Sequence, residues 1–107
     1  MSAQARQLKI KTGAVKRLIK DKQCYLMEAE SQRKRIAEYE ARNAHEADVR
    51  KQQEVLAETL AMVPDTERRI RVAMQDLENL LAVADDGEAV EEARAAVDLA
   101  KAALAQQ

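Results

Sequence analysis

The middle third of the chain carries a core-type residue every seven positions, and this spacing limits the folds open to it. The first series runs Val49, Leu56, Val63, Ile70 and Leu77. A second series follows four residues behind, with Gln53, Leu60, Glu67, Met74 and Leu81. Alternating steps of four and three residues are typical of helices that pack along a shared seam. Residues 46–83 are therefore expected to form one long helix.

Two further helices are predicted on either side, over residues 3–42 and 88–106. One seam series of the first helix is Leu8, Val15, Lys22, Ala29 and Ile36, and the other is Leu18, Tyr25, Gln32 and Tyr39. Ile19 and Leu26 widen this stripe, so the first helix should face more than one neighbour. The stripe of the last helix is Val90, Ala93, Val97, Ala100 and Leu104. Its small side chains favour close packing with little buried area.

Turn-forming residues divide the helices. Asn43-Ala44-His45 separates the first two, and Asp85-Asp86-Gly87 separates the last two, with Gly87 expected at a C-cap or turn position. Because both connections are short, neighbouring helices should run antiparallel. The predicted fold is all-α, an elongated antiparallel three-helix bundle with a short third helix, and residues 1–107 form a single domain.

Pro64 lies inside the heptad run of the second helix. Proline cannot donate to the preceding turn, and a kink that gives a bent rod is expected there. Two helices divided at Pro64 are the alternative. A turn centred near Ala44–His45 would place residue i of the first helix opposite residue 89 − i of the second. This register predicts an ion pair between Lys22 and Glu67, or else two side chains that both reach solvent.

Catalytic chemistry finds little support in the residues. The chain has one His and one Cys, and it has no glycine-rich phosphate loop. Cys24 and His45 are about twenty residues apart along a predicted helix, too far for a nucleophile and its base. Two such ligands do not make a structural zinc site. No enzymatic activity, metal or cofactor is expected, and 2% aromatic residues provide little to line a small-molecule pocket.

Charge is unevenly distributed although the net charge is only −1. Residues 1–22 hold seven basic residues and one acidic residue, whereas residues 76–107 hold eight acidic and two basic residues. The two segments could simply neutralise each other inside the bundle. Without aromatic residues among the basic ones, nucleic-acid binding is not expected. A lone cysteine and the lack of a long apolar run favour the cytosol and no membrane contact.

Gly13 is unusual because glycine costs about 1 kcal/mol relative to alanine inside a helix. Either the helix starts near Thr12, or another element approaches the backbone closely at Gly13.

Residues 7–18, with the sequence QLKIKTGAVKRL, resemble the N-terminal signature of the tubulin-binding cofactor A family. Lys51-Gln52, Val55-Leu56, Val63-Pro64-Asp65 and Arg68-Arg69-Ile70 resemble the pattern in the middle of that family's chains. Thr66 departs from the family, which often has Cys there, and so does the Ala-rich third helix. The likeness covers about residues 6–82.

The resemblance implies a non-enzymatic, cytoplasmic and cytoskeleton-associated chaperone that holds quasi-native β-tubulin during assembly of the αβ heterodimer. Other tubulin-folding cofactors are further implied partners, and the chain would be a monomer or a weak homodimer. The alternative is a self-associating coiled-coil scaffold without affinity for tubulin. The candidate partner-binding residues are chosen because their positive charges cluster or because they match the motifs of the family. They are Lys9, Lys11, Thr12, Gly13, Lys16, Arg17, Lys20, Pro64, Asp65, Arg68 and Arg69.

Overall fold

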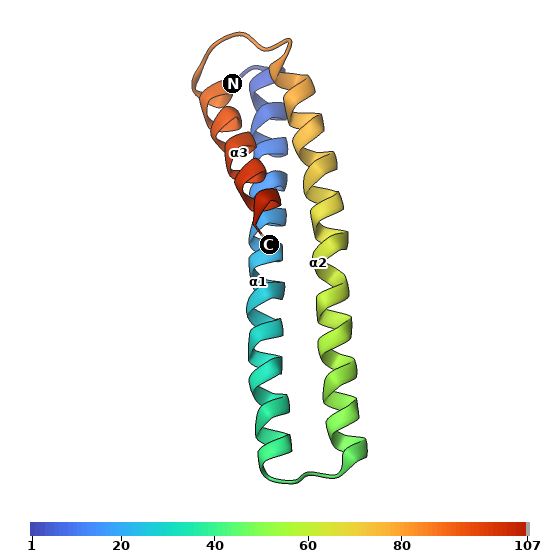
Figure 1. Cartoon of the computed structure of the whole chain (residues 1–107). Coiled ribbons are helices and arrows are strands. Elements are labelled where there is room, and N and C mark those ends of the chain that lie inside the picture. The colour runs from blue at the N-terminus through green and yellow to red at the C-terminus, as the bar shows by residue number, and fades with distance from the viewer. Residues whose placement is uncertain (107) are drawn as a thin grey trace. The chain divides into compact units, whose positions relative to one another are not determined.

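The computed structural model describes residues 1–106 as three helices joined by short loops (Figure 1). The helices are α1 (Ala3–Ala41), α2 (Glu46–Leu81) and α3 (Glu88–Ala105), and the described residues contain no strand. The predicted all-α fold is confirmed, and the helix bounds agree with the prediction to within two residues.

Two compact units share the first two helices. The three-helix unit contains Met1–Asp21 and the chain from Thr66 onward, and the hairpin unit is Lys22–Asp65. The first unit thus holds the start of α1, the end of α2 and all of α3. The second holds the remainder of α1 and α2 with the loop between them. The prediction of a single domain over the whole chain stays a prediction.

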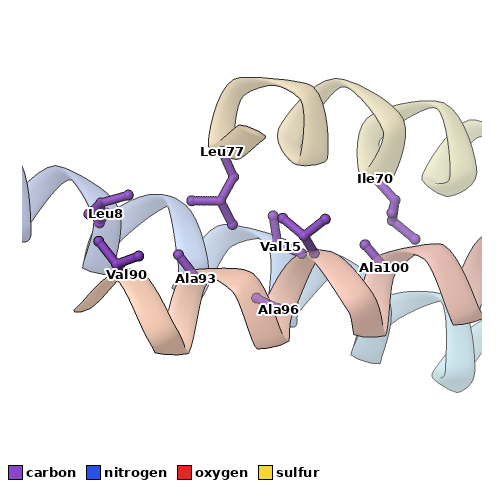
Figure 2. Close-up of a cluster of buried hydrophobic side chains, with 9 residues drawn as sticks. Leu8, Val15, Ile70, Leu77, Val90, Ala93, Ala96 and Ala100 are labelled. Carbon is purple, nitrogen blue, oxygen red and sulfur yellow. The ribbon is translucent and has the colours of Figure 1, made fainter. Parts of the chain in front are cut away.

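The core of the three-helix unit draws side chains from all three helices (Figure 2). Val15, Ile70 and Leu77 are fully buried, and so are Ala93 and Ala100 of α3. The predicted first seam series of α1 and α2 is therefore confirmed in this unit. Alanines without exposed surface also confirm that α3 packs closely, since only a small side chain lets two helices approach so tightly.

The hairpin unit has a seam that is partly polar. Ala29 and Ile36 are buried as predicted, but Gln32 is buried with them. Its Nε2 donates to the carbonyl oxygen and to Oε1 of Gln52, both at 2.9 Å. Lys22 is only 2% exposed, so the alternative in which it reaches solvent is wrong. The Lys22–Glu67 ion pair stays a prediction.

The second seam series of α2 was predicted one residue too late in its first half. Gln53 and Leu60 are exposed, whereas Gln52 and Thr59 are partly buried and Thr66 is buried. Residues three and four positions after each member of the first series lie on the two edges of the same helix stripe. Either set therefore repeats every seven residues and is compatible with the heptad pattern. Because Leu60 is apolar and Thr59 is polar, the prediction placed the seam on the edge of the stripe that contains Leu60. The real seam uses a Gln and two Thr.

Asn43 ends α1 and reverses the chain. Its φ of 54° lies in the left-handed region, where Asn is tolerated better than most residues. The Asn43 amide donates to Glu40 O at 3.1 Å, and the Ala44 amide donates to Tyr39 O at 3.0 Å. These two bonds form a Schellman motif.

This cap closes the turn earlier than the assumed centre near Ala44–His45, and the register shifts accordingly. Gln32 bonds to Gln52, whereas the predicted register placed Gln32 opposite Ala57. In the three-helix unit the error is small, since Lys11 lies 3.8 Å from Asp76, two residues from its predicted partner Glu78.

Of the two roles predicted for Gly87, the C-cap is wrong, and the position in the turn between α2 and α3 agrees with the structure. Gly87 is the N-cap of α3, and α2 ends earlier, where Ala82, Val83 and Ala84 donate to its last carbonyls. Those bonds already satisfy the end of α2, so no glycine is needed there.

Pro64 does not divide α2, which runs unbroken from Glu46 to Leu81. The alternative with two separate helices is therefore wrong. The kink itself stays a prediction.

Candidate partner-binding surface

The start of α1 has a buried side and an exposed basic side. Leu8, Thr12 and Val15 face the core. At 3.6 residues per turn, seven of the exposed positions fall within an arc of about 120° on the side away from the core. We call this set the α1 basic face: Arg6, Lys9, Ile10, Gly13, Lys16, Arg17 and Lys20, all of them exposed.

The cations of the α1 basic face are not neutralised within the three-helix unit. Among the described residues, no ion pair joins Lys9, Lys16, Arg17 or Lys20 to an acidic group. Lys11 behaves differently, since its Nζ lies 3.8 Å from Asp76 of α2. Within the described part of the chain, no ion pair connects the other four cations to α3. The structure therefore does not support the alternative in which they only neutralise the acidic residues of α3. It leaves a positive surface available to an external partner.

Gly13 occupies the middle of this charged surface, and Ile10 lies at one edge of it. Ile10 is 68% exposed and is the one large apolar side chain of the α1 basic face. The helix begins at Ala3, so the explanation that it starts near Thr12 is wrong. A Cβ built on Gly13 would meet nothing within 4 Å. Packing inside the chain therefore does not require glycine at this position.

The other predicted site residues have varied surroundings. Thr12 is 4% exposed, and its Oγ1 has no hydrogen-bond partner within the part of the chain that the structure describes. Arg68 and Arg69 are exposed on α2 in the three-helix unit. Pro64 is exposed and Asp65 is half-buried, and both belong to the hairpin unit.

Sequence reasoning left two members of the α1 basic face out of the candidate site. Arg6 and Ile10 share the face with Gly13 because positions 6, 10, 13, 17 and 20 recur at steps of three and four. The same three- and four-residue spacing, followed along the exposed side of α1, predicts Arg6 and Ile10 as members of this face.

A second surface lies in the hairpin unit, where a groove of about 520 Å³ separates parts of α1 and α2. Met27, 70% exposed, and Val55, 39% exposed, provide its apolar lining. Cys24, Glu28 and Thr59 also line it. Such a strip suits weak protein association better than a small ligand, because it is open and shallow.

Reactive groups do not converge in the described residues. Cys24 is a free, exposed thiol, and no three His, Cys, Asp or Glu side chains come together to hold a metal ion. None of the described helices combines the length and apolar character needed to cross a membrane.

Comparison with known proteins assigns the chain to a family. The sequence model for tubulin binding cofactor A matches residues 3–104. The chain belongs to the tubulin binding cofactor A family. Human tubulin-specific chaperone A is 44% identical over 87 residues, which is 81% of each chain.

Two solved structures resemble the fold of this tubulin binding cofactor A family member. Tubulin folding cofactor A from Arabidopsis thaliana superposes with a TM-score of 0.83 at 34% identity, over 92% of this chain and 97% of the other. Rbl2p, named as a β-tubulin-binding post-chaperonin cofactor, gives 0.84 at 34% identity, over 94% and 99%.

Family membership confirms the resemblance seen in residues 7–18 and in the middle of the chain. The family consists of tubulin chaperone cofactors, so the protein's role is non-enzymatic. The same membership implies a soluble cytoplasmic protein.

Proposed function

We propose that this protein binds and holds quasi-native β-tubulin for assembly of the αβ heterodimer, and that the α1 basic face makes the first contact. Family membership supports the client, and Rbl2p is itself named as β-tubulin-binding. The observation that carries the choice of surface is the run of exposed α1 cations without ion pairs in the described chain.

The mechanism needs only reversible surface contact. Tubulin is an acidic protein, so the cations of the α1 basic face would steer it toward α1 and fix its orientation. Such contacts weaken as salt rises, because exposed charges are screened over about 10 Å at 0.1 M ionic strength. A chaperone gains from this weakness, since the client must later leave for its partner subunit.

Arg68 and Arg69 of α2 extend the proposed basic surface within the three-helix unit. Pro64 and Asp65 belong to the hairpin unit, and we keep them as separate candidate contacts because they match the family pattern. Thr12 is buried beneath this surface, so a partner cannot reach its side chain. Its contribution would be to the packing of α1 and not to direct contact. Lys11 contributes less, because it already pairs with Asp76.

Charge reversal tests this proposal. Changing Lys16, Arg17, Arg68 and Arg69 together to Glu should abolish retention of β-tubulin on a native gel. Circular dichroism should show unchanged helix content, because all four residues are exposed. Lys34→Glu with Arg35→Glu reverses two exposed charges of the hairpin unit, and this control should retain tubulin. Normal retention by the fourfold variant would refute the proposed surface.

We further propose that the protein is a monomer or a weak homodimer, is cytoskeleton-associated through its client, and exchanges that client with other tubulin-folding cofactors. The groove lined by Met27 and Val55 favours the alternative of self-association. Met27→Ser should weaken a dimer formed through this groove and leave tubulin retention unchanged. Sedimentation equilibrium of the wild-type chain and the variant shows whether the groove mediates self-association, separately from tubulin binding.

A further inference from the structure

Gly13 has no role in the free protein that another residue could not fill. It lies inside α1, where glycine is less favourable than every residue except proline. Positive φ angles among the described residues occur at Asn43 and Gly87 and not at Gly13. A methyl group added there would meet nothing within 4 Å. The chain therefore keeps an unfavourable residue at a site where alanine would fit.

The neighbours of Gly13 form a rim around a bare patch of backbone. On a helix surface, the side chains nearest to a residue are those three and four positions away. For Gly13 these are Lys9, Ile10, Lys16 and Arg17, all of them exposed. Three positive charges and one apolar side chain thus surround a point without any side chain. Missing side chains allow another backbone to come closer than the usual 8–10 Å between packed helix axes.

We propose that an acidic α-helix of the client crosses α1 at Gly13. Its backbone would lie against the bare patch, an apolar residue would cover Ile10, and carboxylates would pair with Lys9, Lys16 and Arg17. Charge complementarity selects the occupant, because the α1 basic face contains five basic residues and no acidic one. Glycine in place of alanine then costs stability in the free protein and favours the bound state. This inference rests on the proposed function, and it adds the point of contact and the kind of element bound.

Gly13→Ala tests the inference because it separates stability from binding. Alanine should raise the melting temperature by about 4 °C or more, through its better helix propensity. The same methyl group should weaken binding of purified β-tubulin about tenfold, since it crowds a closely packed contact. Gln23→Ala is the control, because Gln23 is exposed on α1 outside the basic face. It should leave both quantities nearly unchanged.

The outcomes distinguish the inference from the proposed function. If the wild-type chain binds β-tubulin and Gly13→Ala binds equally well, the contact at Gly13 is wrong while the function stands. If Gly13→Ala melts at a lower temperature, the free protein needs the glycine and the inference also fails. If the wild-type chain does not bind β-tubulin at all, the proposed function itself fails.

Cross-linking identifies the element that lies on the face. Replacing Ile10 by a photoreactive benzoylphenylalanine puts the probe one turn from Gly13 on the exposed surface. The inference expects an adduct on a β-tubulin helix rich in Asp and Glu. An adduct on a basic or non-helical segment would overturn it, and so would one on a second copy of this chain.

Discussion

Single residues decide where α1 ends and how the chain turns back. Asn43 adopts a φ of 54° and donates to Glu40, while Arg42 lies over the Tyr39 ring at 4.3 Å from its centroid. The sequence predicted a loop at Asn43-Ala44-His45 from turn propensity alone. Turn propensity favours Asn43 over Ala44 for the left-handed position, but it does not fix how the two helices pair beyond the turn. The register of the hairpin unit was wrong by five residues at Gln32, which bonds to Gln52 instead of lying opposite Ala57.

Substitutions at Asn43 should follow the left-handed geometry. Asn43→Val should lower the free energy of unfolding by about 1–2 kcal/mol, because a β-branched side chain clashes with the backbone at positive φ. Asn43→Gly should leave stability unchanged or raise it slightly, since glycine adopts this conformation without strain. Urea unfolding followed by circular dichroism measures both. Equal stability of the Val and Gly variants would contradict the described cap.

Seams within the helices explain what heptad analysis could and could not show. The series from Val49 to Leu77 was found from spacing alone, because apolar residues recur there without interruption. Its companion was misplaced, because Gln52, Thr59 and Thr66 are polar and therefore carry no apolar signal. For Gly87 the sequence left a C-cap and a turn position open. Composition marks a turn, but it does not say which of two helices the glycine caps.

Replacing a buried leucine of α2 by alanine should lower the free energy of unfolding much more than the same change at an exposed leucine. Leu77 is 0% exposed and belongs to the core cluster, so Leu77→Ala should cost about 2–5 kcal/mol of unfolding free energy. Leu60 is 36% exposed, so Leu60→Ala should cost less than about 1 kcal/mol. Chemical denaturation of both variants gives the comparison. A Leu60→Ala variant as damaged as Leu77→Ala would restore the original heptad assignment.

Across the whole molecule, the two units differ in how they are held together. The three-helix unit has a cluster of fully buried aliphatic side chains, whereas the hairpin unit buries Lys22 and Gln32 beside Ala29 and Ile36. The sequence indicated this contrast through its polar seam residues and its short third helix. The candidate site was only partly foreseen. Lys9, Lys16, Arg17 and Lys20 were found by charge, but the lack of ion pairs around them follows from geometry.

Hydrogen exchange should therefore distinguish the units. Amides of the three-helix unit should exchange more slowly than those in residues 22–65, because less apolar surface stabilises the hairpin against local opening. Mass spectrometry of proteolytic fragments after deuterium labelling would report this difference. The opposite order of protection would show that the polar seam contributes more stability than its burial indicates.

Association in solution tests the central claim that this protein acts by holding a tubulin client on an exposed helix surface. Sedimentation velocity should be recorded for the 12.0 kDa chain alone and mixed with purified quasi-native β-tubulin. The account predicts that the chain moves into a faster species together with tubulin, and that this species dissociates as salt is raised. A chain that sediments as a stable dimer and leaves β-tubulin unaccompanied would contradict it.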